Sequence, residues 1–216
     1  MAITITFILS ALALASAILY LRAIYRGPKS AIYVFKPLTT TLILLVAAFA
    51  SEPLSQSYKW LIVAGLLLSL VGDVFLMLPG DKFIAGWAAF LLAHLAYIVA
   101  FISTGGLYRS AWLLLVGLAY GIVILRYLWP YLGRLRLPAA VYMLVIVIMA
   151  WQAAGRIEQG LGGSAWLAFA GALLFVASDS ILTVNRFARP FHSARLVYMS
   201  AYYLAQWLIA LSVVAG

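Results

Sequence analysis

Residues 83–103 read FIAGWAAFLLAHLAYIVAFIS, and this stretch decides the fold class. It contains no Asp, Glu, Lys or Arg, and its apolar residues cover every side of a helix instead of alternating with polar ones. A helix needs about 20 apolar residues to cross the hydrocarbon core of a bilayer, whereas a membrane-spanning strand has about ten residues of alternating polarity. The stretch therefore predicts a transmembrane helix and argues against a barrel.

The rest of the chain repeats this pattern. Of its 216 residues, 67% are hydrophobic and 9% are charged, so much of the apolar surface must face lipid. The absence of Cys excludes disulfides, thiol catalysis and thiolate metal sites. We predict an all-α polytopic membrane protein, a bundle of eight transmembrane helices in a single transmembrane domain over residues 1–216. Besides 83–103, the predicted spans are 3–21, 33–51, 58–78, 110–129, 137–154, 164–183 and 194–214.

The net charge of +9 is distributed in a way that indicates membrane topology and not a nucleic-acid partner. Three basic residues lie near the even-numbered connections, and eleven lie near the odd-numbered ones. Because cytoplasmic connections carry the excess of Lys and Arg, this asymmetry predicts extracytoplasmic termini in a bacterial inner (plasma) membrane. Arg186, Arg189 and Arg195 are also placed to contact anionic lipid headgroups, although a purely topological role is the more common one for such residues. The eleven are Arg22, Arg26, Lys29, Lys36, Lys82, Arg126, Arg134, Arg136, Arg186, Arg189 and Arg195.

Asp73 and Asp179 are carboxylates inside hydrophobic spans, in the stretches SLVGDVFLML and FVASDSILTV. An ionisable group in lipid is costly, so its default interpretation is a functional site that faces a cavity or a partner. Each Asp lies about one turn from the polar end of its span, at a rise of about 1.5 Å per residue. The matched depth predicts one shared site that opens toward the cytoplasmic leaflet.

The chain also resembles itself at an interval of about half its length. Aligning the two aspartates matches FLLAHLAYI with AYYLAQWLI, and FKPLTTTLILLV with RLPAAVYMLVIV. In this alignment Pro37 and Pro138 open equivalent helices. We predict two parallel four-helix repeats, 1–106 and 107–216, related by an axis along the membrane normal. This axis, and the small residues around Gly65 and Gly171, predict that the third and seventh helices pack together.

Two stripes of polar and aromatic residues indicate a pocket around the aspartates. His94 and Tyr97 share one face of the fourth span, and Tyr202 and Gln206 share one face of the eighth. Such stripes are also common in ordinary helix packing, and His94 alone suits a hydrogen-bonded structural residue equally well. Lys36, at the start of the second span, is expected to reach inward as a counter-ion or phosphate ligand, or to snorkel to the interface.

At these residues the sequence resembles the YhhN family of eight-helix membrane proteins, which includes lysoplasmalogenases. The resemblance rests on GDVFLML, then FxxGxxxFLLAHLAYIVAF, SDSILTVNRF and YYLAQWLIA, and it runs from about residue 36 to 206. It implies hydrolysis of the vinyl ether bond of a 1-alkenyl lysophospholipid to a fatty aldehyde and a glycerophospho-alcohol. The same resemblance implies catalytic roles for two residues and site roles for four, namely Asp73 and Asp179, and Lys36, His94, Tyr97 and Asn185.

The residues suit this chemistry independently of the resemblance. A vinyl ether is hydrolysed after proton transfer to its β-carbon, so the site needs an acid and a nearby negative charge. Two carboxylates in a low-dielectric site would share one proton, and the protonated one would act as general acid. We expect that acid to be Asp179, because Ser178 and Ser180 offer hydrogen bonds and Phe175 an apolar neighbour. Lys36 and Arg186 would hold the phosphate, and the tyrosines would contact the alkenyl chain or a choline headgroup.

Three other classes of protein are alternatives to the hydrolase. An intramembrane aspartyl protease is disfavoured because Leu70 stands where a GxGD motif has its first glycine. A zinc hydrolase would need more imidazoles than His94 and His192 provide, so neither a metal nor another cofactor is predicted. A site of Asp73, Asp179 and His94 is the weaker alternative, which loss of activity on chelation would support. A proton-coupled lipid or small-molecule transporter is the main alternative, because repeats and paired acids also suit alternating access.

Overall fold

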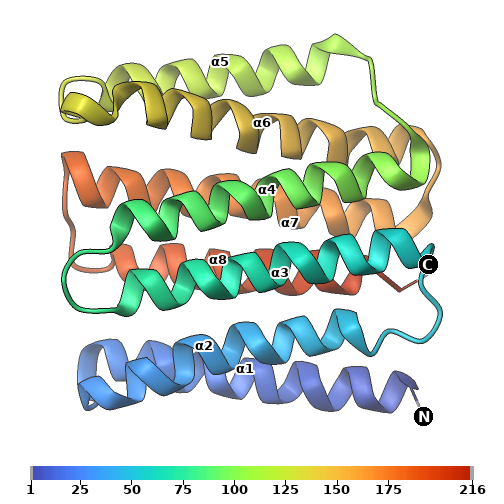
Figure 1. Cartoon of the computed structure of the whole chain (residues 1–216), viewed down its shortest axis with the longest axis horizontal. Helices are drawn as coiled ribbons and strands as arrows, with labels where there is room; N and C mark the ends of the chain where they lie inside the picture. Colours follow the sequence, from blue (N-terminus) through green and yellow to red (C-terminus); the bar gives the residue numbers. More distant parts are fainter. Residues whose placement is uncertain (1, 215–216) are drawn as a thin grey trace.

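The computed structural model describes residues 2–214, with side chains from residue 3 onward. Within this range the chain forms eight α-helices, one 3₁₀ turn and one π-helical turn (Figure 1). The eight predicted helices and the all-α class are therefore confirmed. Their bounds are α1 (Ala2–Arg26), α2 (Lys29–Ala48), α3 (Gln56–Met77), α4 (Phe83–Gly105), α5 (Ala111–Leu128), η1 (Gly133–Leu135), α6 (Arg136–Glu158), α7 (Gly162–Thr183), η2 (Val184–Ala188) and α8 (Ala194–Leu211).

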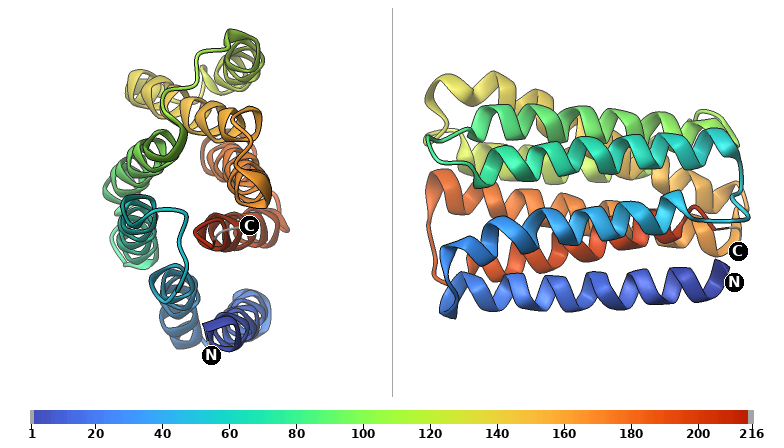
Figure 2. Two further views of the ribbon diagram at one scale, coloured as in Figure 1. Left: turned by 90° about the vertical axis from the view of Figure 1, so that its right-hand side faces the viewer. Right: turned by 60° about the horizontal axis from the view of Figure 1, so that its bottom comes forward.

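Helices α1 to α7 are long and apolar enough to cross a membrane by length and composition. Helix α8 differs because it carries several polar residues of the candidate site, among them Arg195, Tyr202 and Gln206. It nevertheless lies inside the bundle, beside α2 and α7 (Figure 2). The chain is thus an integral membrane protein in which α8 turns its polar site residues toward the other helices and leaves Leu196, Val197 and Leu204 exposed.

The odd-numbered connections, which carry most of the basic residues, all lie at one end of the bundle, and both chain ends lie at the other (Figure 1). This is the arrangement that alternate crossings of a membrane require. The orientation of that basic end toward the cytoplasm stays a prediction from charge alone.

The two prolines do not occupy equivalent positions in their helices. Pro138 lies in the first turn of α6, which begins at Arg136, as predicted. The prediction that Pro37 opens its helix is wrong, because α2 begins at Lys29 and encloses the proline. The residues before Pro37 continue the helix even though a proline ring has no amide hydrogen to donate.

Helices α3 and α7 do not form a packed pair, so the prediction that they meet directly is wrong. Their glycines instead let them approach α4 and α8. A Cβ at Gly72 would lie 2.7 Å from the Phe90 ring on α4, and a Cβ at Gly171 would lie 2.8 Å from the Ala205 carbonyl oxygen on α8. The small residues serve close packing as expected, but the partners are the sequence-adjacent helices.

The packing of the first four helices resembles that of the last four. The pairs α1–α2, α2–α3 and α3–α4 correspond to α5–α6, α6–α7 and α7–α8, and the α2–α8 contact corresponds to α6–α4. An exchange of the two halves therefore maps these packed pairs onto one another. Two four-helix repeats around a twofold axis would give this pattern, and the duplication itself stays a prediction.

Candidate active site

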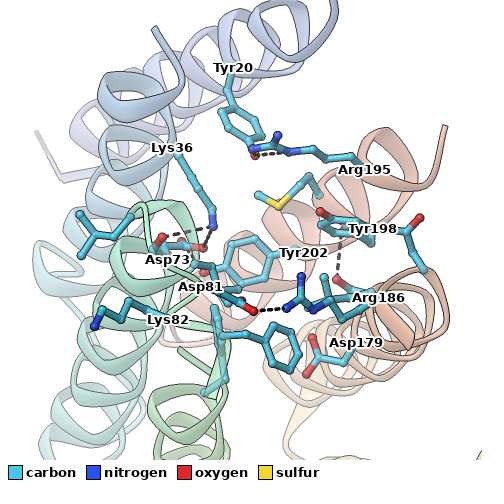
Figure 3. A pocket seen from close by; sticks show the side chains of 18 residues that line it. Tyr20, Lys36, Asp73, Asp81, Lys82, Asp179, Arg186, Arg195, Tyr198 and Tyr202 are labelled. Atoms are coloured by element: carbon cyan, nitrogen blue, oxygen red, sulfur yellow. Dashed lines mark hydrogen bonds and ion pairs between the residues drawn. The ribbon is translucent and has the colours of Figure 1, made fainter. Parts of the chain in front are cut away.

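A cavity of about 290 Å³ opens at the basic end of the bundle, and both Asp73 and Asp179 line it (Figure 3). The carboxylates come from the last turns of α3 and α7. The remaining walls come mainly from α1, α2, α8 and the connections after α3 and α7. Of the predicted substrate-binding residues, those that also line this cavity are Lys36, Asn185, Arg186 and Tyr202.

Asp73 is fully engaged by hydrogen-bond donors. Its Oδ1 lies 3.2 Å from the Lys36 ammonium, and its Oδ2 accepts hydrogen bonds from Thr40 at 2.6 Å and Tyr202 at 2.7 Å. Lys36 also donates to the Asp73 backbone carbonyl at 3.2 Å. Lys36 and Thr40 are four residues apart on α2 and so share one helix face. Asp73 is therefore held as an ion pair with both oxygens occupied.

Asp179 has a different environment. Its Oδ2 accepts a short hydrogen bond from the Tyr142 hydroxyl and lies 3.9 Å from Nε2 of His94. Its Oδ1 accepts no hydrogen bond from any described residue. No Lys or Arg among the described residues lies within ion-pair distance of it. Asp179 is thus a buried carboxyl group with one free oxygen and no fixed positive charge.

His94 lies behind Asp179 in an aromatic box. It is 0% exposed, and neither ring nitrogen has a hydrogen-bond partner in the described chain. The rings of Phe175 and Tyr142 meet it edge to face, at centroid distances of 4.6 and 5.3 Å. A buried imidazole without partners is unusual, and its Nε2 lies 3.9 Å from Oδ2 of Asp179.

Aromatic rings lie beside both carboxylates. Phe90 contacts Tyr202 and Phe175 edge to face, and Tyr202 is bonded to Asp73 while Phe175 packs on His94. No hydrogen bond joins Asp73 to Asp179, and each has its own set of partners. The two groups therefore share a cavity without forming a hydrogen-bonded pair.

The serines beside Asp179 do not support it in the way the sequence suggested. Ser178 donates to the Tyr198 carbonyl at 2.8 Å, and Ser180 donates to the Val176 carbonyl at 2.8 Å. Both hydroxyls thus bond to backbone oxygens, so that reason for choosing Asp179 as the acid is wrong. The free Oδ1 and the neighbouring His94 supply a better one.

Tyr97 and Gln206 are brought together, but they do not line the cavity. The Tyr97 hydroxyl donates to Oε1 of Gln206 at 2.7 Å, and both side chains are 0% exposed. This bond links α4 to α8 beneath the carboxylates. The two predicted substrate-binding residues thus lie in the layer that supports the site.

The mouth of the cavity carries a second ion pair. Arg186, in the π-helical turn after α7, donates to the Asp81 carboxylate at 2.6 Å, and it packs over the Phe83 ring at 5.2 Å. Asn185 uses its side-chain oxygen to accept the Phe191 amide at 3.2 Å. Both predicted ligands are thus tied to connections at the rim.

Sequence reasoning missed Thr40, Tyr142 and Tyr20, and it expected Arg195 to set the topology or to contact anionic lipid headgroups, without foreseeing its place in the cavity wall. Thr40 and Tyr142 hold the carboxylates, and Tyr20 and Arg195 form a hydrogen-bonded pair in the cavity wall. Thr40 could have been found as the residue one turn after Lys36. Tyr142 carries a weaker signal, because its match in the internal alignment is Thr41 and not Thr40. Nothing in the sequence indicates that Arg195 turns inward.

Among residues 2–214 no group of three or more His, Asp or Glu side chains is arranged to hold a metal ion.

Comparison with known proteins gives a consistent picture. The YhhN family model matches residues 31–213. The "Uncharacterized membrane protein YhhN" of Escherichia coli O6:H1 is 33% identical over 197 residues, 91% of this chain and 94% of that protein. "Lysoplasmalogenase TMEM86B" of Homo sapiens is 40% identical over 161 residues, 73% of this chain and 65% of that protein. "Lysoplasmalogenase TMEM86A" of Bos taurus is 35% identical over 162 residues, 71% and 65% of the two chains. No solved structure matches the chain.

Proposed function

Because the chain belongs to the YhhN family, and mammalian relatives carry the name lysoplasmalogenase, we propose that it is a membrane-embedded ether hydrolase. Its substrate is a 1-alkenyl lysophospholipid, and its products are a fatty aldehyde and a glycerophospho-alcohol. The observation that carries the proposal is the cavity of about 290 Å³ in which two buried carboxyl groups have different partners.

In this proposal Asp179 is the proton donor. Tyr142 and His94 both approach its Oδ2, which leaves Oδ1 to carry the proton. Transfer of that proton to the β-carbon of the vinyl ether converts the double bond into an oxocarbenium ion. The Asp179 carboxylate left behind supplies the negative charge that stabilises this cation, in a site where charges interact more strongly than in water.

Water completes the reaction. It adds to the α-carbon of the oxocarbenium ion and passes a proton to Asp179, which restores the acid for the next turnover. The resulting hemiacetal loses the glycerol oxygen as an alcohol and becomes the aldehyde. His94 has a positioning role behind Oδ2 of Asp179, 3.9 Å away, because its burial among aromatic rings disfavours a charged imidazole.

Asp73 has a supporting role in this scheme. Its charge is balanced by Lys36, and three donors occupy its oxygens, so it is less suited to proton transfer. It fixes the Tyr202 hydroxyl at the cavity wall and the Lys36 ammonium beneath it. We propose that Asp73 and Lys36 form the floor of the headgroup region, instead of a dyad with Asp179.

The site would open toward the cytoplasmic leaflet of a bacterial inner membrane. The cavity lies at the end of the bundle that carries the basic connections, which the positive-inside rule assigns to the cytoplasm. A single-chain lipid in that leaflet would reach the carboxylates with its headgroup at the rim.

The test of this function is aldehyde release by purified protein offered 1-alkenyl, 1-acyl and 1-alkyl lysophospholipids in parallel. Aldehyde is expected from the alkenyl lipid alone, and its carbon next to the carbonyl gains deuterium when the assay is run in heavy water. Glu158→Gln, which changes an exposed acid outside the cavity, is the matched control and keeps full activity. Release of fatty acid from the acyl lipid instead would contradict the proposal.

A proton-coupled lipid transporter is the second candidate, and the matched packing of the two four-helix halves favours it. One preparation of proteoliposomes can distinguish transport from hydrolysis. Lipid movement across the bilayer of proteoliposomes, without any aldehyde product, would support transport over hydrolysis.

A further inference from the structure

Four basic side chains line the cavity, and they differ in how their charge is balanced. Lys36 pairs with Asp73 at 3.2 Å, and Arg186 pairs with Asp81 at 2.6 Å. The other two are Lys82 and Arg195, and neither lies within ion-pair distance of a carboxylate in the described chain. Lys82 is exposed at the start of α4, whereas Arg195 is half-buried. Arg195 is therefore the inward-facing cation without a counter-charge.

The guanidinium of Arg195 is held by a single protein group. Its Nε and one Nη donate to the Tyr20 hydroxyl at 3.3 and 3.2 Å, and it lies 5.7 Å from the centre of that ring. A guanidinium has five N–H donors; two are used here, and three have no acceptor among the described residues. These free donors can form a bidentate contact with an anion.

Tyr20 fixes the direction of this guanidinium. The tyrosine is 0% exposed, and its ring meets Tyr203 edge to face at a centroid distance of 5.7 Å. Because Tyr20 is held by packing, it restricts the Arg195 side chain before a ligand binds, and less entropy is lost on binding. Tyr20 and Arg195 thus form a preorganised donor at the edge of the cavity.

We propose that Arg195 binds the phosphate of the lysophospholipid headgroup, with Tyr20 as its positioning residue. This assignment rests on the proposed function for the nature of the lipid, and it replaces Lys36 and Arg186, which already bind carboxylates. In Figure 3 Arg195 lies beside Tyr20 at one edge of the cavity and Asp179 at the opposite edge. A lipid anchored there by its phosphate directs its sn-1 oxygen and vinyl ether across the cavity toward Asp179.

The first test compares two substrates that differ only in the phosphate, namely a 1-alkenyl glycerophosphoethanolamine and a 1-alkenyl glycerol. Arg195→Gln is expected to raise KM for the phospholipid roughly 10- to 100-fold and to leave turnover of the alkenyl glycerol unchanged. Arg195→Lys should give a KM for the phospholipid between those of wild type and Arg195→Gln, because an ammonium cannot form the bidentate contact. Arg189→Gln, which changes an exposed arginine of the connection before α8 that does not line the cavity, is the control and leaves both KM values unchanged.

Tyr20→Phe separates positioning from simple packing. It removes the hydroxyl that orients Arg195 and keeps the buried ring. A rise in KM for the phospholipid alone supports the proposal, whereas an equal loss of kcat on both substrates would mean that Tyr20 acts only on the fold.

A binding measurement distinguishes failure of this proposal from failure of the proposed function. Thermal stabilisation of the detergent-solubilised protein is measured with a non-hydrolysable 1-alkyl lysophospholipid and with the matching 1-alkyl glycerol. Wild type and Asp179→Asn should both be stabilised more by the phospholipid, and Arg195→Gln equally by the two lipids. This pattern without any aldehyde release would support the phosphate site and contradict the hydrolase. A phosphate preference that survives in Arg195→Gln, or that wild type lacks, would overturn the assignment.

Discussion

Asp73 and Asp179 line the same cavity at corresponding positions of the two halves, yet their surroundings differ. Asp73 lies 3.2 Å from Lys36 and accepts hydrogen bonds from two hydroxyls. Asp179 has one hydroxyl donor, Tyr142, and the His94 imidazole at 3.9 Å. Its Oδ1 accepts no hydrogen bond from the described residues. In the proposed mechanism, Asp73 is the carboxyl group that its partners hold in place, and Asp179 is the one that exchanges a proton.

The difference follows from what faces each aspartate across the bundle. Helix α2 supplies an ammonium and a hydroxyl to Asp73, whereas α6 supplies only a phenol to Asp179. Helix α8 supplies the Tyr202 phenol to Asp73, and α4 places His94 beside Asp179. The residues on the neighbouring helices therefore give the two aspartates different chemical surroundings in similarly packed halves.

The largest effect should come from Asp179→Asn. Loss of a general acid lowers the rate by about 10² to 10⁴, and the amide oxygen can still accept the Tyr142 hydrogen bond, so the fold should persist. We expect aldehyde release to fall to that extent while the melting temperature changes little. Unchanged kcat in a folded variant would remove Asp179 from the mechanism.

Lys36→Met should mainly reduce stability, because it leaves Asp73 buried without its counter-ion. Breaking a buried ion pair costs about 3–5 kcal/mol, and unfolding in mixed micelles measures it. The double variant Lys36→Met/Asp73→Asn should recover most of this loss. The matched control is Lys59→Met, which removes a buried lysine that bonds only to the Ala50 carbonyl; its effect should be smaller. A double variant no more stable than Lys36→Met would argue against a charge-balanced pair.

Two tyrosine-to-phenylalanine substitutions compare the roles of single hydrogen bonds to the two aspartates. Tyr142→Phe removes the donor to Asp179 and should lower kcat about tenfold, since a hydrogen bond to a charged group contributes about 1.5–3 kcal/mol. Tyr202→Phe removes one of three donors to Asp73 and should lower the free energy of unfolding by about 1–2 kcal/mol with less effect on kcat. The opposite assignment of effects would mean that the roles of the two carboxylates are reversed.

The smallest effect is expected at the rim. The side chains of Arg186 and Asp81 are 44% and 66% exposed, and exposed ion pairs contribute about 0.2–1 kcal/mol. Arg186→Gln should therefore change stability by less than about 1 kcal/mol, and KM by only a few fold. A loss of phosphate selectivity as large as that of Arg195→Gln would place the headgroup at the rim instead.

The fold was largely predictable because apolar runs of membrane length report helices directly. All eight were found, and the basic residues correctly grouped the odd-numbered connections at one end. Helix partners were not predictable, because a glycine such as Gly72 signals close approach without naming its neighbour. The position of Pro37 inside α2 was missed for a similar reason, since its helix-breaking tendency is local and the surrounding bundle overrides it.

The two aspartates of the site were predictable, because charged residues inside transmembrane spans are rare and therefore indicate a functional site. That rule found Asp73 and Asp179 and placed them in one cavity. The sequence left Lys36 open as a counter-ion, a phosphate ligand or a snorkelling residue. The structure shows the counter-ion, paired with Asp73, and that choice depends on the rotation of α2 about its axis. Tyr142 and the inward position of Arg195 were missed because tyrosines and arginines near helix ends are common at membrane interfaces.

The matched packing of the two halves leads us to propose that they arose as parallel repeats of 1–106 and 107–216. The different partners of the aspartates then record how far the halves have diverged. Exchange of Thr41 and Tyr142, which the internal alignment matches, would test whether the positions are still equivalent. Variants that fold as well as wild type would support equivalence, and unfolded protein would oppose it.

The most direct test of the central claim is infrared spectroscopy of the purified protein, comparing wild type with Asp179→Asn and with Lys36→Met/Asp73→Asn. A protonated carboxylic acid has a carbonyl stretching band that a carboxylate lacks. We predict that wild type shows a buried acid band near neutral pH, that Asp179→Asn removes it, and that the Lys36→Met/Asp73→Asn variant retains it. Loss of the band in the Asp73 variant, with retention in Asp179→Asn, would contradict the account.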